Sequence, residues 1–155
     1  KPTRMIIAMG RTGNVSPNYA MWDGTAWTQL TDKMGTNSND VFALSDTDVW
    51  FTGHFSDVFH WDGTALAEHA VGPGMEDFGT IRAACQNQVY FIADRNSASS
   101  RGVYQYDGVA WTEVETGDGT DYKQFRDLEI TKDGKLLVVG QDAAGKALIM
   151  WGSPQ

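Results

Sequence analysis

The sequence predicts an all-β fold built from about four repeats, each with three to four antiparallel strands. Three observations support this: a short phrase recurs along the chain, an apolar run precedes each copy, and the composition favours strands and turns. The 155 residues include 17 Gly, 6 Trp, 5 Tyr and 7 Phe, while charged residues make up 21%. Aromatic residues favour strands, and frequent Gly and Asp favour tight turns.

The recurring phrase begins with an aromatic residue and continues with Asp-Gly. Residues 22–28 read Trp-Asp-Gly-Thr-Ala-Trp-Thr, and related phrases occupy 61–67 and 106–112. A degraded copy begins at Trp151, so the anchoring aromatics stand at 22, 61, 106 and 151 and are separated by 39, 45 and 45 residues. This period predicts a repeat architecture.

Each Asp-Gly pair predicts a hairpin. A two-residue type I′ turn would make Trp22 face Thr25 and would place Trp22 and Trp27 as diagonal neighbours on one face of the sheet. The same geometry gathers two further clusters, namely Phe59 with Trp61 and Leu66, and Tyr104 with Tyr106 and Trp111.

Short apolar runs predict the strands that precede each hairpin. The stronger runs lie at 5–10, 49–53, 89–93 and 136–140, and they suit strands buried on both faces. Weaker runs come earlier, at 40–44, 80–84 and 127–131. The period and strand number match four-stranded propeller blades, in which each sheet packs its face on the next.

The chain therefore divides into one propeller-like domain with repeats at approximately 1–30, 39–70, 78–115 and 125–155. The first repeat lacks its first strand, and the fourth lacks its last. Either two blades are three-stranded, or the chain belongs to a longer one, or copies assemble. The absence of an initiator Met is consistent with processing or truncation, and no signal peptide is recognised.

The paired phrases at 49–53 and 22–28 resemble bacterial extracytoplasmic β-propeller repeats. Those repeats read valine-tryptophan-x-x-glycine followed by tyrosine or tryptophan, aspartate, glycine, threonine, any residue and tryptophan. The resemblance implies a propeller fold in a secreted, periplasmic, cell-surface or virion-surface protein. It implies no ligand, because the matching residues are structural.

Charge and cysteine content exclude several classes of partner. The net charge of −8 argues against non-specific nucleic-acid binding, which needs many phosphate-neutralising cations, and against docking on anionic membranes. No apolar run is long enough to insert into a membrane. Cys85 is the single cysteine, so no intrachain disulfide forms.

Metal binding and nucleophilic catalysis each have a weak candidate. His54 and His60, with Asp57 or Asp62, could hold zinc, but their spacing matches no standard zinc pattern. We therefore expect His60 to occupy an alternating strand position. Cys85 with a distant His could form a nucleophilic pair, although its small apolar surroundings favour a buried packing role.

Acidic residues offer two further candidates. The loop at 116–121 contains Asp118 and Asp121 and could hold calcium, but it lacks EF-hand spacing, and a solvated turn between blades is the expectation. Residues 37–40 are interpreted as a similar polar turn. The repeated Asp23, Asp62 and Asp107 are interpreted as turn residues in different blades rather than as an acid–base pair, whose carboxylates would lie within roughly 10 Å.

These observations predict a non-enzymatic extracytoplasmic recognition module that binds glycan or protein through propeller loops. No cofactor is expected, no residue is singled out as a ligand contact, and a homo-oligomer or assembly is an open alternative. A structural component of a virion, phage tail or surface filament is the second interpretation. A fragment of a carbohydrate-active enzyme is the third.

Overall fold

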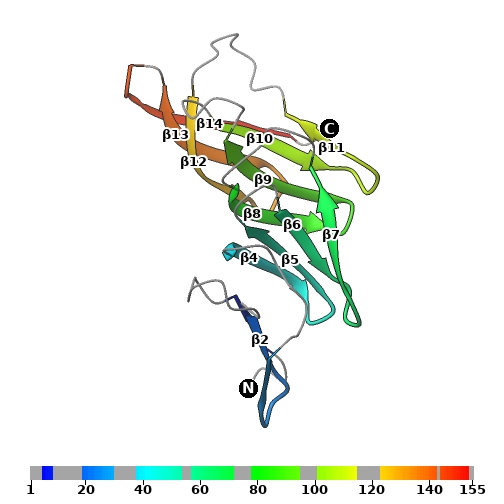
Figure 1. The fold of residues 1–155 in the computed structure, drawn as a ribbon. Helices are drawn as coiled ribbons and strands as arrows, with labels where there is room; N and C mark the ends of the chain where they lie inside the picture. The colour runs from blue at the N-terminus through cyan, green and yellow to red at the C-terminus, as the bar shows by residue number, and fades with distance from the viewer. Residues whose placement is uncertain are drawn as a thin grey trace.

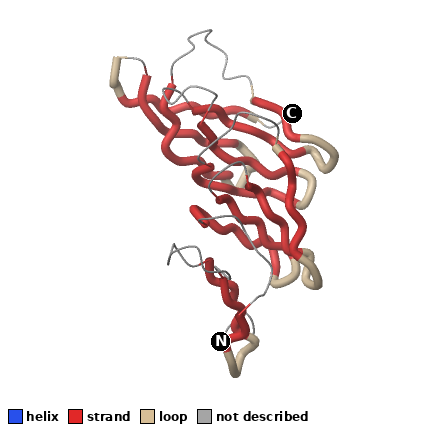
Figure 2. The backbone as a smooth tube through the Cα atoms, viewed as in Figure 1, coloured by secondary structure: helices blue, strands red, loops and turns tan. Residues whose placement is uncertain are grey.

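The computed structural model describes residues 5–8, 19–29, 38–53, 57–71, 78–94, 101–114, 123–142 and 144–153. Every regular element among these residues is a β-strand (Figure 2). The predicted all-β class is therefore confirmed. The described residues include no helix that is long and apolar enough to cross a membrane.

The strands form four antiparallel sheets, of three, four, four and three strands, and each sheet follows chain order. The first sheet contains β1 (Met5–Ala8), β2 (Tyr19–Trp22) and β3 (Trp27–Gln29). The second contains β4 (Ser38–Ser45), β5 (Asp48–Gly53), β6 (Asp57–Trp61) and β7 (Leu66–Ala70). The third contains β8 (Phe78–Cys85), β9 (Gln88–Asp94), β10 (Arg101–Tyr106) and β11 (Trp111–Glu113). The fourth contains β12 (Lys123–Ile130), β13 (Leu136–Asp142) and β14 (Ala147–Gly152).

The four sheets lie in a row in chain order. Strand β4 contacts β1 on one side and β8 on the other, and β8 in turn contacts β12. The described parts of the first and fourth sheets lie at opposite ends of this row (Figure 1). We call the face of a sheet that is turned toward the preceding sheet its leading face, and the opposite face its trailing face. In the first and fourth sheets the same names are given to the faces at equivalent strand positions.

The hairpin at each Asp-Gly pair has a different register from the predicted one. Trp22 pairs directly with Trp27, so four residues form the loop, and the predicted two-residue turn is wrong. The Asp23 Oδ1 atom accepts hydrogen bonds from the N–H groups of Thr25 and Ala26, at 2.8 and 2.9 Å, which stabilises the wider loop. Gly24 in this loop has a positive φ of 103°.

The predicted aromatic clusters nevertheless form, because directly paired residues also share one face. Trp22 and Trp27 have ring centroids 5.5 Å apart. In the third sheet, the Tyr106 and Trp111 rings are 4.9 Å apart.

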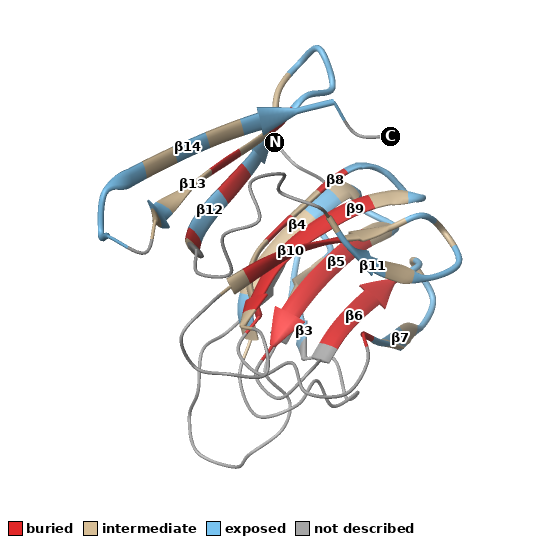
Figure 3. Cartoon of the chain, turned by 90° about the horizontal axis from the view of Figure 1, so that it is seen from above, coloured by how far each residue is buried: buried red, intermediate tan, exposed pale blue. Residues whose placement is uncertain are grey.

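The core lies between successive sheets. Strands β5 and β9 are buried on both faces, as predicted from their apolar runs (Figure 3). The same prediction is wrong for the run at 136–140, because β13 buries only Leu136 and Val138, on one face. Trp50 and Val58, from the trailing face of the second sheet, pack with Phe91 and Tyr104, from the leading face of the third. The next junction joins the trailing face of the third sheet to the leading face of the fourth, and its buried residues are Tyr90, Ile92, Val103, Phe125, Leu128, Leu136 and Val138.

Trp151 does not occupy the place of the other anchoring aromatics. In the second sheet, buried Val49 pairs with Trp61 on the leading face. In the fourth sheet, buried Leu136 pairs with Gly152, so Gly152 takes the position that corresponds to Trp61. Trp151 comes one residue earlier and therefore lies on the trailing face. A shift of one residue moves a side chain to the opposite face of a sheet. Trp151 is accordingly 79% exposed.

Candidate functional site

An aromatic–histidine cluster, comprising Trp50, His60, His69, Tyr106 and Trp111, lies where the second sheet meets the third. The Trp50 ring stacks on His60 with centroids 4.2 Å apart and is also 5.0 Å from His69. Tyr106 and Trp111 approach the same ring from the third sheet, at 5.6 and 6.1 Å. Strands far apart in the sequence thus contribute to one surface.

Asp48 fixes the buried half of this cluster. Its Oδ1 atom accepts hydrogen bonds from the Trp50 indole N–H, at 3.1 Å, and from His60 Nε2, at 2.8 Å. A carboxylate only accepts, so the His60 Nε2 atom carries the proton in this contact. Trp50 and His60 are 1% and 8% exposed, which makes this half a rigid support.

The other half of the cluster reaches solvent. His69, Tyr106 and Trp111 are each half-buried. Burial lowers the pKa of His69 below its ordinary value, and the neighbouring His60 lowers it further. The His69 ring is therefore neutral at pH 7 and presents one donor and one acceptor nitrogen beside aromatic faces. Such a surface can stack on a sugar ring or on an apolar side chain and can form hydrogen bonds with its polar groups.

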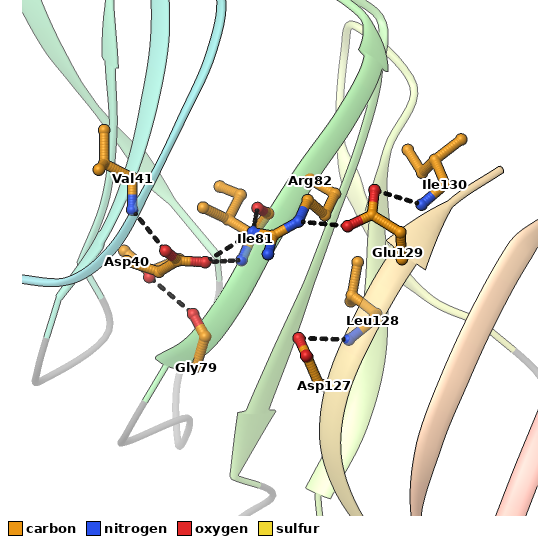
Figure 4. A network of polar contacts seen from close by, with 10 residues as sticks. Asp40, Val41, Gly79, Ile81, Arg82, Asp127, Leu128, Glu129 and Ile130 are labelled. Atoms are coloured by element: carbon orange, nitrogen blue, oxygen red, sulfur yellow. Dashed lines mark hydrogen bonds and ion pairs between the residues drawn. The ribbon is translucent and has the colours of Figure 1, made fainter. Parts of the chain in front are cut away.

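A second polar arrangement joins the first strands of three sheets (Figure 4). The Asp40 Oδ2 atom, on β4, accepts hydrogen bonds from the Ile81 N–H and from Arg82 Nη1, both on β8, at 3.0 and 2.8 Å. Arg82 Nε then donates to Glu129 Oε2 on β12, at 3.2 Å. One guanidinium thus links the second, third and fourth sheets.

The carboxylates of Asp40 and Glu129 stabilise the positive charge of Arg82. Burial by itself lowers the pKa of Arg82, but hydrogen bonds to Glu129 and Asp40 raise it above the ordinary value overall. Arg82 therefore stays cationic. Its contact with Asp40 is the more shielded of the two, since the Asp40 side chain is 29% exposed and that of Glu129 is 60% exposed. These residues hold the sheets together and leave little of the carboxylate of Asp40 for a ligand.

The predicted zinc candidates do not come together in the part of the chain that the structure describes. His54 and the side chain of Asp57 lie outside that part. His60 occupies a strand position, as predicted, and Asp62 holds its own hairpin loop through the N–H groups of Thr64 and Ala65. The described residues contain no group of three or more His, Cys, Asp or Glu that could hold a metal ion.

Two other expectations about polar residues are wrong. Cys85 is exposed rather than buried, because it ends β8 directly before the turn at 86–87. Residues 38–40 belong to strand β4 instead of a polar turn, and Asn39 and Asp40 bond to the third sheet. Asn37 and the acidic loop containing Asp118 and Asp121 lie outside the described residues.

No sequence pattern predicted site roles for Asp40, Asp48, Arg82 or His69. A signal for Asp40 does exist, because Asp40 and Asp127 each precede an apolar residue in a predicted first strand. Each Oδ1 atom accepts a hydrogen bond from the next residue's N–H, that of Val41 or Leu128, at 2.9 Å. The partners that Asp40 and Asp48 acquire in other strands have no local signal.

Four sheets in a row, each packed face to face on the next, define a β-propeller-type fold. The structure described as "YCF48 bound to D1 peptide" is similar, with a TM-score of 0.65 and 12% sequence identity over 100% of this chain. YCF48 is a β-propeller, and this chain spans 49% of its length. The predicted propeller-like fold is therefore confirmed. No protein-family model and no curated protein matches the sequence.

Proposed function

We propose that this chain is a non-enzymatic recognition module that acts outside the cytoplasm and binds an extended protein segment or a glycan. The observation that carries the proposal is the half-exposed part of the aromatic–histidine cluster, formed by His69, Tyr106 and Trp111. These side chains come from two sheets and rest on a buried support. Aromatic faces beside a neutral imidazole are suited to such ligands.

Two further observations support parts of the proposal. The similar structure is described as YCF48 bound to a D1 peptide, which makes a protein segment the first class of ligand to test. The resemblance of the repeats to bacterial extracytoplasmic propellers supports a location outside the cytoplasm. The net charge of −8 favours a ligand that is neutral or basic.

The proposal is tested by screening the purified chain against a phage-displayed peptide library and a glycan array. We expect a ligand whose affinity falls at least about tenfold in His69→Ala and in Tyr106→Phe, because each removes a polar group from the exposed half of the cluster. Thr112→Ala is the matched control, since Thr112 is exposed on β11 beside Trp111. The proposal would be overturned if neither screen gave a ligand, or if every ligand bound both variants as tightly as the wild type.

The interpretation as an enzyme fragment is tested separately with chromogenic glycosides. Asp23, Asp62 and Asp107 each use Oδ1 to hold the loop that follows them. We therefore expect no turnover that disappears when one of the three is replaced by Asn. Turnover with that behaviour would favour the enzyme over the recognition module.

A further inference from the structure

The trailing face of the fourth sheet carries apolar side chains at positions that are buried in the second sheet. We define the tail face as Leu137, Val139, Ile149 and Trp151, which pair as Leu137 with Trp151 and Val139 with Ile149. The corresponding pairs on the trailing face of the second sheet are Trp50 with His60, and Thr52 with Val58.

The two faces differ in how far they are covered. Trp50, Thr52, Val58 and His60 are at most 8% exposed beneath the third sheet. Ile149 and Trp151 are 72% and 79% exposed. Their strand, β14, lies on the outside of the described strands (Figure 3). Large exposed apolar side chains gathered on one face indicate an interaction surface.

The opposite end of the row carries the matching half of a junction. We define the head face as Trp22 and Trp27, which lie on the leading face of the first sheet. Tyr106 and Trp111 hold the same places in the third sheet, and there they pack against Trp50 of the preceding sheet. Trp27 is 48% exposed.

Asp127 is a second, independent indication that another sheet can pack on the trailing face of the fourth sheet. It forms the same hydrogen bond to the next N–H as Asp40, whose other oxygen binds the following sheet. Asp127 is exposed, whereas Asp40 is half-buried in its junction (Figure 4).

We propose that two copies of this chain associate head to tail, with the head face of each docking on the tail face of the other. The chain itself holds both halves of the sheet–sheet junction, so a second copy is the occupant that continues the packing already seen. Propellers have about 4–8 blades, and two rows of four sheets fall within this range. The inference does not depend on the proposed ligand site.

The association is tested by light scattering and sedimentation velocity on the full chain. We expect a mass of twice 17.0 kDa at micromolar concentrations. Ile149→Lys on the tail face and Trp27→Lys on the head face should each weaken the association at least about tenfold. Val109→Lys is the matched control, because Val109 is 88% exposed on the hairpin loop of the third sheet and belongs to neither face. Circular dichroism checks that each variant is folded.

Mixing the two variants separates head-to-tail docking from every other arrangement. The Trp27→Lys chain retains its tail face and the Ile149→Lys chain retains its head face, so an equimolar mixture should form an open pair although each alone is monomeric. A wild-type monomer at all concentrations overturns the proposal. So do a mixture that stays monomeric, and wild-type assemblies larger than two copies.

Discussion

Gly63 has a backbone conformation and surroundings that both resist a side chain. Its φ is 94°, and an added Cβ would lie 2.6 Å from the Thr47 Cγ2 atom. Gly63→Ala should therefore lower the free energy of unfolding by more than about 1 kcal/mol, as measured by urea denaturation. Gly134→Ala is the control for φ alone, since Gly134 has φ of 78° with nothing within 4 Å. Equal losses in the two variants would contradict the steric part of the argument.

Asp62 makes the loop of the second sheet sensitive to acid. Hydrogen bonds from the Ala65 N–H, the Thr64 hydroxyl and the Thr64 N–H lower the pKa of Asp62 from 3.8 to about 2. A carboxyl group whose pKa is lowered by folding stabilises the protein above its unfolded value, and this stability is lost as the pH falls from 3.8 through about 2. Asp62→Asn should reduce the fall in stability over this range. The prediction would be contradicted if the free energy of unfolding fell equally with pH in the variant and in the wild type.

His69 should give a second pH dependence near neutrality. Its pKa is lowered by burial and by His60, so below pH 6.5 the unfolded chain binds more protons than the folded chain. Stability therefore falls as the pH drops below 6.5, until the folded pKa is passed. His69→Phe keeps an aromatic ring but removes the titrating group. The midpoint of urea denaturation should therefore change less with pH in this variant than in the wild type. An NMR titration that places the His69 pKa at or above 6.5 would contradict the prediction.

At the scale of elements, Asp40 is the main polar contact between β4 and β8. Asp40→Asn removes one of the two ionic partners of Arg82 and places an amide where Oδ2 now accepts two hydrogen bonds. Hydrogen bonds to charged groups contribute about 1.5–3 kcal/mol, so we expect a loss in that range in urea denaturation. Asp127→Asn is the control, because Asp127 holds the Leu128 N–H of its own strand, and the substitution should change stability by less than about 0.5 kcal/mol. Similar losses in both variants would show that the bridge to the third sheet contributes little.

The strands were predictable because their signals are local. The apolar run at 89–93 and the Asp-Gly pair at 107–108 place β9 and the following hairpin without any knowledge of neighbouring strands. The hairpin register was missed because the Asp23 carboxylate, rather than the Asp-Gly backbone alone, determines the loop length. Trp151 was misplaced because spacing along the sequence does not show which face a residue takes when one strand is shifted.

The candidate site was less predictable than the fold. The Asp40 and Arg82 side chains meet although 42 residues separate them, and such a contact depends on how two sheets pack. The aromatic–histidine cluster has the same origin, since Trp50 and Trp111 belong to different sheets. Repeats identify what each sheet contains, whereas the contacts between sheets arise only in the assembled row.

At the scale of the whole molecule, stability should vary along the row of sheets. In a repeat protein each unit contacts only its neighbours, so end units open more readily than central ones. The second and third sheets each pack on two neighbours, and β9 is almost fully buried. Strand β14 is largely exposed, and Trp27 on β3 is 48% exposed.

Hydrogen exchange measured by mass spectrometry should reproduce this order. We expect amides of β5 and β9 to exchange only through global unfolding, and amides of β3 and β14 to exchange through local opening with protection at least about tenfold lower. Because head-to-tail association covers both end sheets, protection in β3 and β14 should increase with protein concentration in the wild type and stay constant in Ile149→Lys. Uniform protection in all four sheets at low concentration would mean that the row unfolds as one cooperative unit. It would contradict the nearest-neighbour description of the fold.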